Sequence, residues 1–273
     1  VTYNPIPPRI VGHAKLALTT ANPNLVEGRE LLSPQGVAVD TTADPPILYV
    51  ADTLNNRVLG WRDAVGFANG AFADVVVGQR DKFSTFVLGP GTSFFAGLYL
   101  PTGLAVDKDG NLFVADSGNN RILRYPKPFA QSDPVQSPDL VLGQSGLTSR
   151  AANAGGRSAQ TLALFTSPII PTQVAFDSQG NLYSTDPGNG RVLRYAAAAV
   201  QSGAATFGPA ADLVLGQADF STAPQSPTSV TDLTRLLGPA GIAIDPAGRL
   251  FVSDAFHRVL VWEPPHNTNG RPA

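Results

Sequence analysis

The sequence has no cysteine and no methionine, and it is poor in charge. The absence of cysteine excludes disulfide bonds and thiol chemistry, but it leaves the compartment open. Charged residues make up only 15% of the chain, and the formal net charge of −2 gives no basic field that would attract nucleic acid. No apolar run reaches the roughly 18 residues of a membrane helix, and no signal peptide is present, so we expect no membrane insertion. Because methionine is missing even at position 1, we expect a processed or excised segment of a longer protein.

What the sequence has in place of these features is a fourfold repeat. Its second copy reads LPTGLAVDKDGNLFVADSGNNRILRY at Leu100–Tyr125, and similar stretches begin at Leu32, Ile170 and Leu237. A shorter motif trails the first three copies and ends at Gln79, Gln144 and Gln217. The fourth copy lacks this motif, and a related pentapeptide, RIVGH, stands near the start of the chain at Arg9–His13. Repeats of this length are typical of solenoids and propellers.

Within each copy the apolar residues alternate with a period of two, which predicts β-strands. In the first copy we expect strands at Gly36–Asp40, Ile47–Asp52, Arg57–Trp61 and Asp74–Gln79. Four antiparallel strands over such a span make one propeller blade. The only stretch that favours a helix, Ala196–Gln201, is short and lies between predicted strands.

The residues at Pro101–Tyr125 closely resemble the NHL repeat, whose family builds β-propellers from such blades. The resemblance implies an all-β fold of four-stranded antiparallel blades in a single domain, residues 1–273. NHL propellers include protein- and RNA-binding modules, sensor domains, and related lyases and lactonases, so the resemblance does not choose a function. The four blades are expected at residues 33–79, 101–144, 171–217, and 238–262 together with 9–13.

The missing fourth motif bears on how the ring closes. If Arg9–His13 pairs beside Arg258–Trp262, the N- and C-terminal strands share one blade and no edge stays exposed. This arrangement predicts a closed four-bladed ring. The alternative is an arc of a larger, for example six-bladed, propeller that is completed by further sequence or by another subunit, which would make the protein an oligomer.

Long inserts separate the last strand of each blade from the first strand of the next. In a propeller this connection leaves on the same face as the loop between the second and third strands, so the inserts should crowd one rim. They either form a lid over the channel or form a binding cup. The inserts run between residues 13 and 33, 80 and 100, 145 and 170, and 218 and 238.

Most residues that could carry chemistry occur once in every blade. A catalytic pair occurs once in a protein, so an acid–base pair repeated in each blade is expected to brace a turn. By the same reasoning the aromatic residue at one repeat position is expected to pack blades together. The carboxylates are Asp52, Asp116, Asp186 and Asp254, the guanidinium groups are Arg57, Arg121, Arg191 and Arg258, and the aromatic residues are Trp61, Tyr125, Tyr195 and Trp262.

Two histidines depart from the repeat. His257 stands where the other copies have asparagine or glycine, and His13 stands where they have glutamine. If the ring closes as predicted, these two imidazoles meet near Asp254. Such a set could hold a divalent ion, Zn²⁺ or Ca²⁺, or could act in acid–base chemistry. The alternative is chance divergence in the junction blade, because no HxH or HxxxH spacing supports a metal.

The second insert is rich in aromatic residues within a Gly/Ser/Thr-rich loop. These residues either form a small satellite core that anchors the loop, or form an apolar or carbohydrate-accepting wall beside the propeller axis. They are Phe83, Phe86, Phe94, Phe95 and Tyr99.

Two functions from different classes follow from the sequence. The first is a non-catalytic binding or scaffold module that recognises a protein, a small molecule or a carbohydrate on its insert-bearing face. Low charge and the lack of a catalytic cluster favour a larger extracytoplasmic or secreted bacterial protein as its source. The second is a metal-assisted lyase or lactonase-like hydrolase at the propeller axis.

Overall fold

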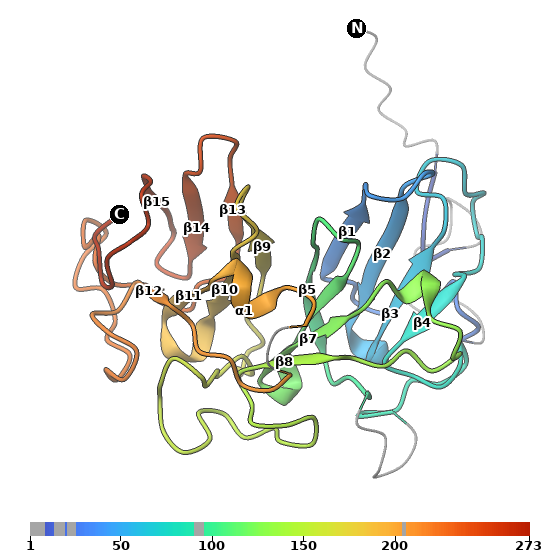
Figure 1. Cartoon of the computed structure of the whole chain (residues 1–273), viewed down its shortest axis with the longest axis horizontal. Coiled ribbons are helices and arrows are strands. Elements are labelled where there is room, and N and C mark those ends of the chain that lie inside the picture. Colours follow the sequence, from blue (N-terminus) through green and yellow to red (C-terminus); the bar gives the residue numbers. More distant parts are fainter. Residues whose placement is uncertain (1–8, 14–19, 21–25, 90–95, 204–205) are drawn as a thin grey trace, which may run out of the picture.

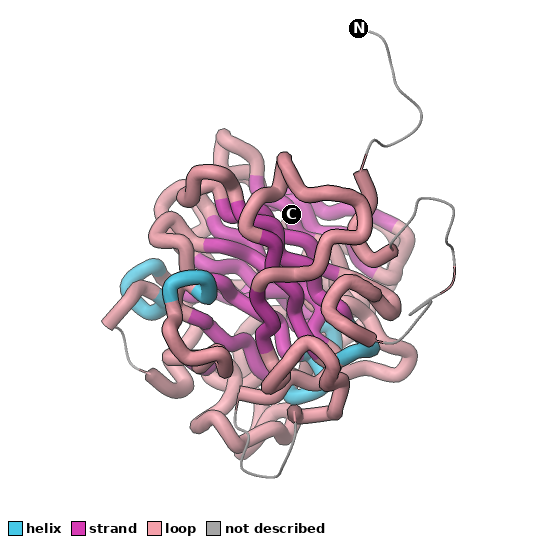
Figure 2. The backbone as a smooth tube through the Cα atoms, turned by 90° about the vertical axis from the view of Figure 1, so that its right-hand side faces the viewer, coloured by secondary structure: helices cyan, strands magenta, loops and turns pink. Residues whose placement is uncertain are grey.

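The computed structural model of the chain describes residues 9–13, 20, 26–89, 96–203 and 206–273. These residues form four antiparallel sheets, each of which is one propeller blade (Figure 1). In the second view the strands lie inside and are surrounded by loops (Figure 2). The all-β propeller architecture predicted from the repeat is therefore confirmed.

Blade 1 shows how the repeat folds. Its strands are β1 (Gly36–Asp40), β2 (Ile47–Asp52), β3 (Arg57–Trp61) and β4 (Val75–Val77), paired in that order. The first three have the predicted bounds. The fourth is shorter than predicted because Gly78 takes a positive φ of 88°, which ends the extended run.

The other blades repeat this order. In blade 3, the short helix α1 (Ala197–Val200) lies between the third and fourth strands. It falls inside the stretch predicted to favour a helix. The last blade has three strands in the described part of the chain. The strands are β5 (Pro101–Val106), β6 (Leu112–Asp116), β7 (Arg121–Tyr125) and β8 (Leu140–Leu142) in blade 2; β9 (Val174–Phe176), β10 (Leu182–Asp186), β11 (Arg191–Tyr195) and β12 (Leu213–Leu215) in blade 3; and β13 (Ile242–Ile244), β14 (Leu250–Asp254) and β15 (Arg258–Trp262) in blade 4.

The turn between the second and third strands ends in the same way in every blade, although the turn of blade 4 is one residue shorter. A short 3₁₀ turn or bend ends on a residue in the left-handed region, where asparagine and glycine are best tolerated. His257 adopts this conformation in blade 4 without either advantage. The φ values are 53° at Asn56, 52° at Asn120, 58° at Gly190 and 57° at His257.

Consecutive blades are joined by apolar clusters between their faces. Tyr49 and Ala51 of β2, for example, pack in one cluster with Leu104 and Val114 of blade 2. Similar clusters join blade 2 to blade 3 and blade 3 to blade 4. Burial of alternating strand residues on both faces of each inner blade is the main favourable contribution to this stacking.

The closing strand pair predicted between Arg9–His13 and β15 is not formed among the described residues. Gly12 forms an isolated parallel bridge with Glu30. Val11 and Leu31 pack against the cluster on the outer face of blade 1, which includes Trp61. This packing holds the N-terminal segment on blade 1, whereas blade 4 lies at the opposite end of the molecule (Figure 1).

The α-helical content in the described ranges is limited to one turn. The only α-helix there, α1, has four residues. None of the helices in those ranges is therefore long and apolar enough to span a bilayer.

Candidate functional site

The repeated carboxylate and guanidinium form a buried structural unit in blade 2. Arg121 Nε donates to Asp116 Oδ2 across 2.7 Å. The same oxygen accepts from Asn119 Nδ2, and Asp116 Oδ1 accepts from the Tyr99 backbone N–H, each at 2.7 Å. Burial raises the pKa of the Asp116 carboxyl, and the charge of Arg121 opposes that rise. This carboxylate is fully buried and accepts hydrogen bonds from three of the protein's own donors.

The same arginine ties the two neighbouring inserts to the blade. Arg121 donates through Nη2 to the Gly97 carbonyl, which precedes β5, and through Nη1 to the Leu147 carbonyl, which follows β8. Arg57 makes the corresponding bonds to the carbonyls of Glu30 and Lys82. The inserts therefore lie on the face that carries the turn between the second and third strands, as predicted.

Blades 3 and 4 keep this unit with one change. Arg191 donates to Asp186 and to carbonyls of both adjacent inserts, including Phe220. In blade 4, the shortest hydrogen bond from Arg258 to Asp254 runs from Nη2 to Oδ2 and is 3.2 Å long. Arg258 also donates to carbonyls of the preceding insert. The prediction that these pairs brace the blades is confirmed. The repeated aromatic residues, Trp61, Tyr125, Tyr195 and Trp262, are all buried, as predicted for packing residues.

The predicted metal set is not assembled within one chain. His13 lies in the segment held on blade 1, whereas His257 and Asp254 belong to blade 4. Asp254 is committed to Arg258 and to the backbone N–H of Leu237. Over the ranges that the structure describes, no three His, Asp or Glu side chains come together in a way that could hold a metal ion.

The aromatic residues of the second insert separate into different surroundings. Phe83 and Phe86 are exposed. Tyr99 is half-buried and stacks on Phe165 of the next insert, with ring centroids 6.1 Å apart. Phe94 and Phe95 lie outside the described residues. A continuous aromatic wall is therefore not visible, but Phe83 borders a groove.

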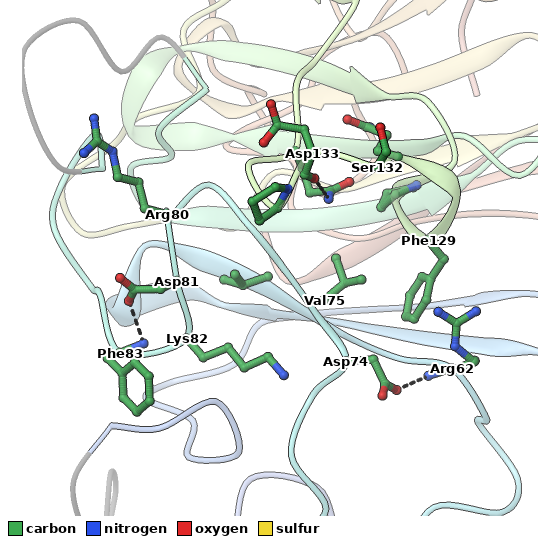
Figure 3. A pocket seen from close by; sticks show the side chains of 15 residues that line it. Arg62, Asp74, Val75, Arg80, Asp81, Lys82, Phe83, Phe129, Ser132 and Asp133 are labelled. Atoms are coloured by element: carbon green, nitrogen blue, oxygen red, sulfur yellow. Dashed lines mark hydrogen bonds between the residues drawn. The ribbon is translucent and has the colours of Figure 1, made fainter.

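This rim groove has a volume of about 480 Å³ and lies between the outer strand of blade 1 and the loop that follows β7 (Figure 3). Its floor includes Val75 and Val76 of β4, and Pro128 and Phe129 form part of the opposite wall. The floor thus belongs to a strand, and the opposite wall is held by the contact between Phe129 and Tyr49 of blade 1. Such a volume is within the range of small-ligand and peptide side-chain pockets.

Each carboxylate of the rim groove accepts at least one hydrogen bond from a backbone N–H group. Asp81 accepts hydrogen bonds from the backbone N–H groups of Phe83 and Ser84 and from the Ser84 hydroxyl. The hydroxyl of Ser84 contributes most to lowering the pKa of Asp81 below its usual range. Asp74 accepts the backbone N–H of Arg62, and Asp133 accepts that of Val135 (Figure 3).

The cations of the rim groove form no ion pair with these carboxylates in the described structure. Lys82 Nζ donates to the Ala73 carbonyl, and the Arg62 guanidinium lies 4.8 Å from the centre of the Phe129 ring. Arg80 extends from the groove wall, away from Asp81 (Figure 3). The rim groove therefore combines apolar surface with three cations that form no ion pair with its three carboxylates, which accept hydrogen bonds from N–H and O–H donors.

Sequence reasoning predicted Phe83 but missed Arg80 and Phe129. A signal for Arg80 is present, because this arginine follows Gln79 where the later copies have Ser145 and Ala218. The contribution of Phe129 has no such signal, because it depends on how the loop after β7 packs on Tyr49 of blade 1.

A model of the NHL repeat matches residues 98–125, which contain β5, β6 and β7. The other blades repeat the aspartate and arginine positions of this match. Together with the propeller arrangement of the sheets, this match identifies the repeat as an NHL repeat. No curated protein matches the chain significantly.

Solved structures that are similar to the chain include proteins of several functions. A streptogramin B lyase structure is 11% identical, with 87% of this chain and 58% of that chain covered at a TM-score of 0.41. A putative 6-phosphogluconolactonase from Bacteroides uniformis is 15% identical, with coverages of 83% and 53% and a TM-score of 0.43. A chain of a nidogen/laminin complex is 15% identical, with coverages of 87% and 66% and a TM-score of 0.42. The chain spans less than two thirds of the length of these structures.

Proposed function

We propose that this NHL-repeat β-propeller is a non-catalytic binding module whose rim groove takes a peptide segment with a carboxylate next to an apolar side chain. The proposal rests on cations of the groove that form no ion pair with its carboxylates. Each carboxylate accepts a hydrogen bond from a backbone N–H group, while Arg80 and Arg62 are not paired with these carboxylates in the described structure. A carboxylate from a ligand would complete this pairing, and charge-assisted hydrogen bonds of this kind are the strong ones.

The apolar half of the ligand has a matching surface. Phe83 is exposed at one side of the groove, and Phe129 with Pro128 lines the other. Exposed aromatic residues and arginines are the residue types that most often dominate binding energy at interfaces. A peptide that places an apolar side chain between these walls would bury surface that the free protein leaves in water.

Acid–base catalysis by Asp81 of the rim groove is disfavoured by its pKa. A lowered pKa keeps Asp81 ionised and makes it a weak base near neutral pH. No histidine lines the groove in the described structure. The alternative function is a metal-assisted lyase or lactonase-like hydrolase at the propeller axis. Elemental mass spectrometry for bound Zn²⁺ or Ca²⁺ tests it.

Selection from a phage-displayed random peptide library tests the proposal. The immobilised chain is panned, and each round is first depleted on the Arg80→Gln, Phe83→Ser double variant. Both side chains are exposed, so the variant is expected to fold. We expect enriched peptides to carry Asp or Glu beside an apolar residue. No enrichment, or peptides recovered equally on the double variant, would contradict the proposal; Val65→Ser, at another exposed site, is the matched control.

A further inference from the structure

The two ends of the row of blades are complementary in their strands. The third strands of blades 1, 2 and 3 each pair with an outer strand, whereas β15 of blade 4 has no such partner in the described structure. At the other end, Arg9–His13 has the sequence of an outer strand but no inner strands of its own. An edge strand with free N–H and C=O groups is a template for pairing with another chain.

The N-terminal segment shares a glycine contact with the outer strands. Gly12 has a φ of 95°, and a side chain there would meet Leu31 at 2.8 Å. The glycine that ends each outer strand makes the same approach to a leucine of the following insert. These pairs are Gly78 with Leu98, Gly143 with Leu162, and Gly216 with Leu236, at 2.4 to 2.5 Å.

The faces at the two ends are apolar and exposed where the equivalent residues of inner blades are buried. Val259 of β15 is 59% exposed, whereas Ile122 at the same position of blade 2 is 0% exposed. Val37 of β1 is 65% exposed, whereas its equivalent in blade 2, Leu104, is 5% exposed. Each end is thus one half of an interface between blades.

A buried polar atom points to the same missing contact. The glutamine that follows each outer strand donates to the carbonyl of the left-handed turn residue of its own blade: Gln79 to Asn56, Gln144 to Asn120, and Gln217 to Gly190. His13 occupies this glutamine position, and its Nδ1 is buried with no hydrogen-bond partner in the part of the chain that the structure describes. The equivalent carbonyl belongs to His257, at the other end of the molecule.

We propose that two copies of this chain associate head to tail, with Arg9–His13 of each copy serving as the outer strand of blade 4 of the other. The register follows from blade 1, where Val58 pairs with Val77 and Leu59 with Val76. Val259 then pairs with Val11 of the second copy, and Leu260 with Ile10. Blade 4 of one copy covers Val37 of the other, and the two-fold pair closes a ring of eight blades without a free edge.

A second copy of the chain is the occupant that the structure favours, because each copy has one blade without an outer strand and one outer-strand sequence without a blade. The spare segment is already placed on blade 1, with Gly12 against Leu31 as in the outer strands and Val11 packed on the cluster around Trp61, which limits the reordering that pairing requires. Conformational ordering is a main cost of association, and its absence favours this contact.

Cysteine cross-linking tests the proposal directly, because the chain has no cysteine of its own. The Val11→Cys, Val259→Cys double variant is oxidised and run on a non-reducing gel. We expect a species of twice 28.5 kDa that reduction removes. An equimolar mixture of the two single variants should give the same species. Replacing Val259→Cys by Val87→Cys, at a similarly exposed site in the second insert, should not.

Light scattering supplies the second measurement. The unmodified chain should have the mass of a dimer at micromolar concentration. Val259→Lys or Val37→Lys should raise the dimer dissociation constant at least tenfold without changing the far-UV circular dichroism, because both sites are exposed in the single chain. Val65→Lys should leave the dimer intact. A monomeric unmodified chain, an internally cross-linked monomer or a filament would overturn the proposal.

Discussion

Arg121 and Asp116 are joined by a hydrogen bond of 2.7 Å from Nε to Oδ2, and both side chains are buried. Because the same guanidinium holds carbonyls of the inserts before and after blade 2, this pair connects the blade to the loops on its rim. The pair is repeated in every blade and has no free acceptor directed at solvent. It therefore braces the rim, and the equivalent Arg57 of blade 1 holds the carbonyl of Lys82, which lines the rim groove.

Replacing Arg121 should destabilise the fold. Arg121→Met leaves Asp116 buried without its countercharge, and breaking a buried pair costs about 3–5 kcal/mol. Urea denaturation followed by circular dichroism measures this loss. Arg249→Met, which removes an exposed ion pair with Asp245, is the matched control and should have a small effect. Equal midpoints for the two variants would contradict the bracing role.

Two glycines with nearly the same φ test the packing of insert against blade. Gly143 (φ 84°) and Gly155 (φ 80°) both need a left-handed backbone, so alanine strains each by about 1–2 kcal/mol. At Gly143 the added carbon would also meet Leu162 at 2.4 Å, whereas at Gly155 nothing lies within 4 Å. Gly143→Ala should therefore lower the melting temperature more than Gly155→Ala. The same temperature for both would mean that the Leu162 contact is unimportant.

Acid should loosen the insert before blade 4. The hydroxyl of Thr234 contributes most to lowering the pKa of Asp232 below its ordinary value of 3.8. A carboxyl whose pKa is lowered in the folded state adds stability above that ordinary value, and this stability is lost as the pH falls through the folded pKa. Between pH 5 and pH 2, Asp232→Asn should lose less thermal stability than the unmodified chain. Parallel pH profiles would show that this turn does not contribute.

Metal analysis separates the binding module from the enzyme alternative. The His13→Gln, His257→Asn variant restores the residue types of the other copies, so it should fold normally. We expect elemental mass spectrometry to find no stoichiometric Zn²⁺ or Ca²⁺ in either protein. A bound ion that disappears in the variant would restore the metal site predicted from the sequence.

The sequence predicts the strands well because their signals are local. Alternation of apolar residues and turn chemistry give the bounds of β2 and β3 as observed. The short β4 differs from prediction because the backbone at Gly78 turns to contact Leu98, which is distant in sequence. A periodic pattern of apolar residues does not predict such contacts between residues that are distant in the sequence.

The candidate site is less predictable than the strands. Phe83 could be named from composition, and Arg80 could have been found as a departure from the repeat. The pairing of Arg62 with Phe129, in contrast, arises from packing between two blades. The N-terminal segment shows the same limit, since its sequence predicts an outer strand but does not say which blade receives it.

The dissociation constant of a peptide enriched on the rim groove tests the proposed binding role most directly. Isothermal titration of that peptide into the unmodified chain, Arg80→Gln, Phe83→Ser and Val65→Ser compares the proposed contacts with a matched exposed site. We expect Arg80→Gln and Phe83→Ser to bind the peptide at least tenfold more weakly than the unmodified chain, and Val65→Ser to bind it with unchanged affinity. The same dissociation constant for all four proteins would contradict this role.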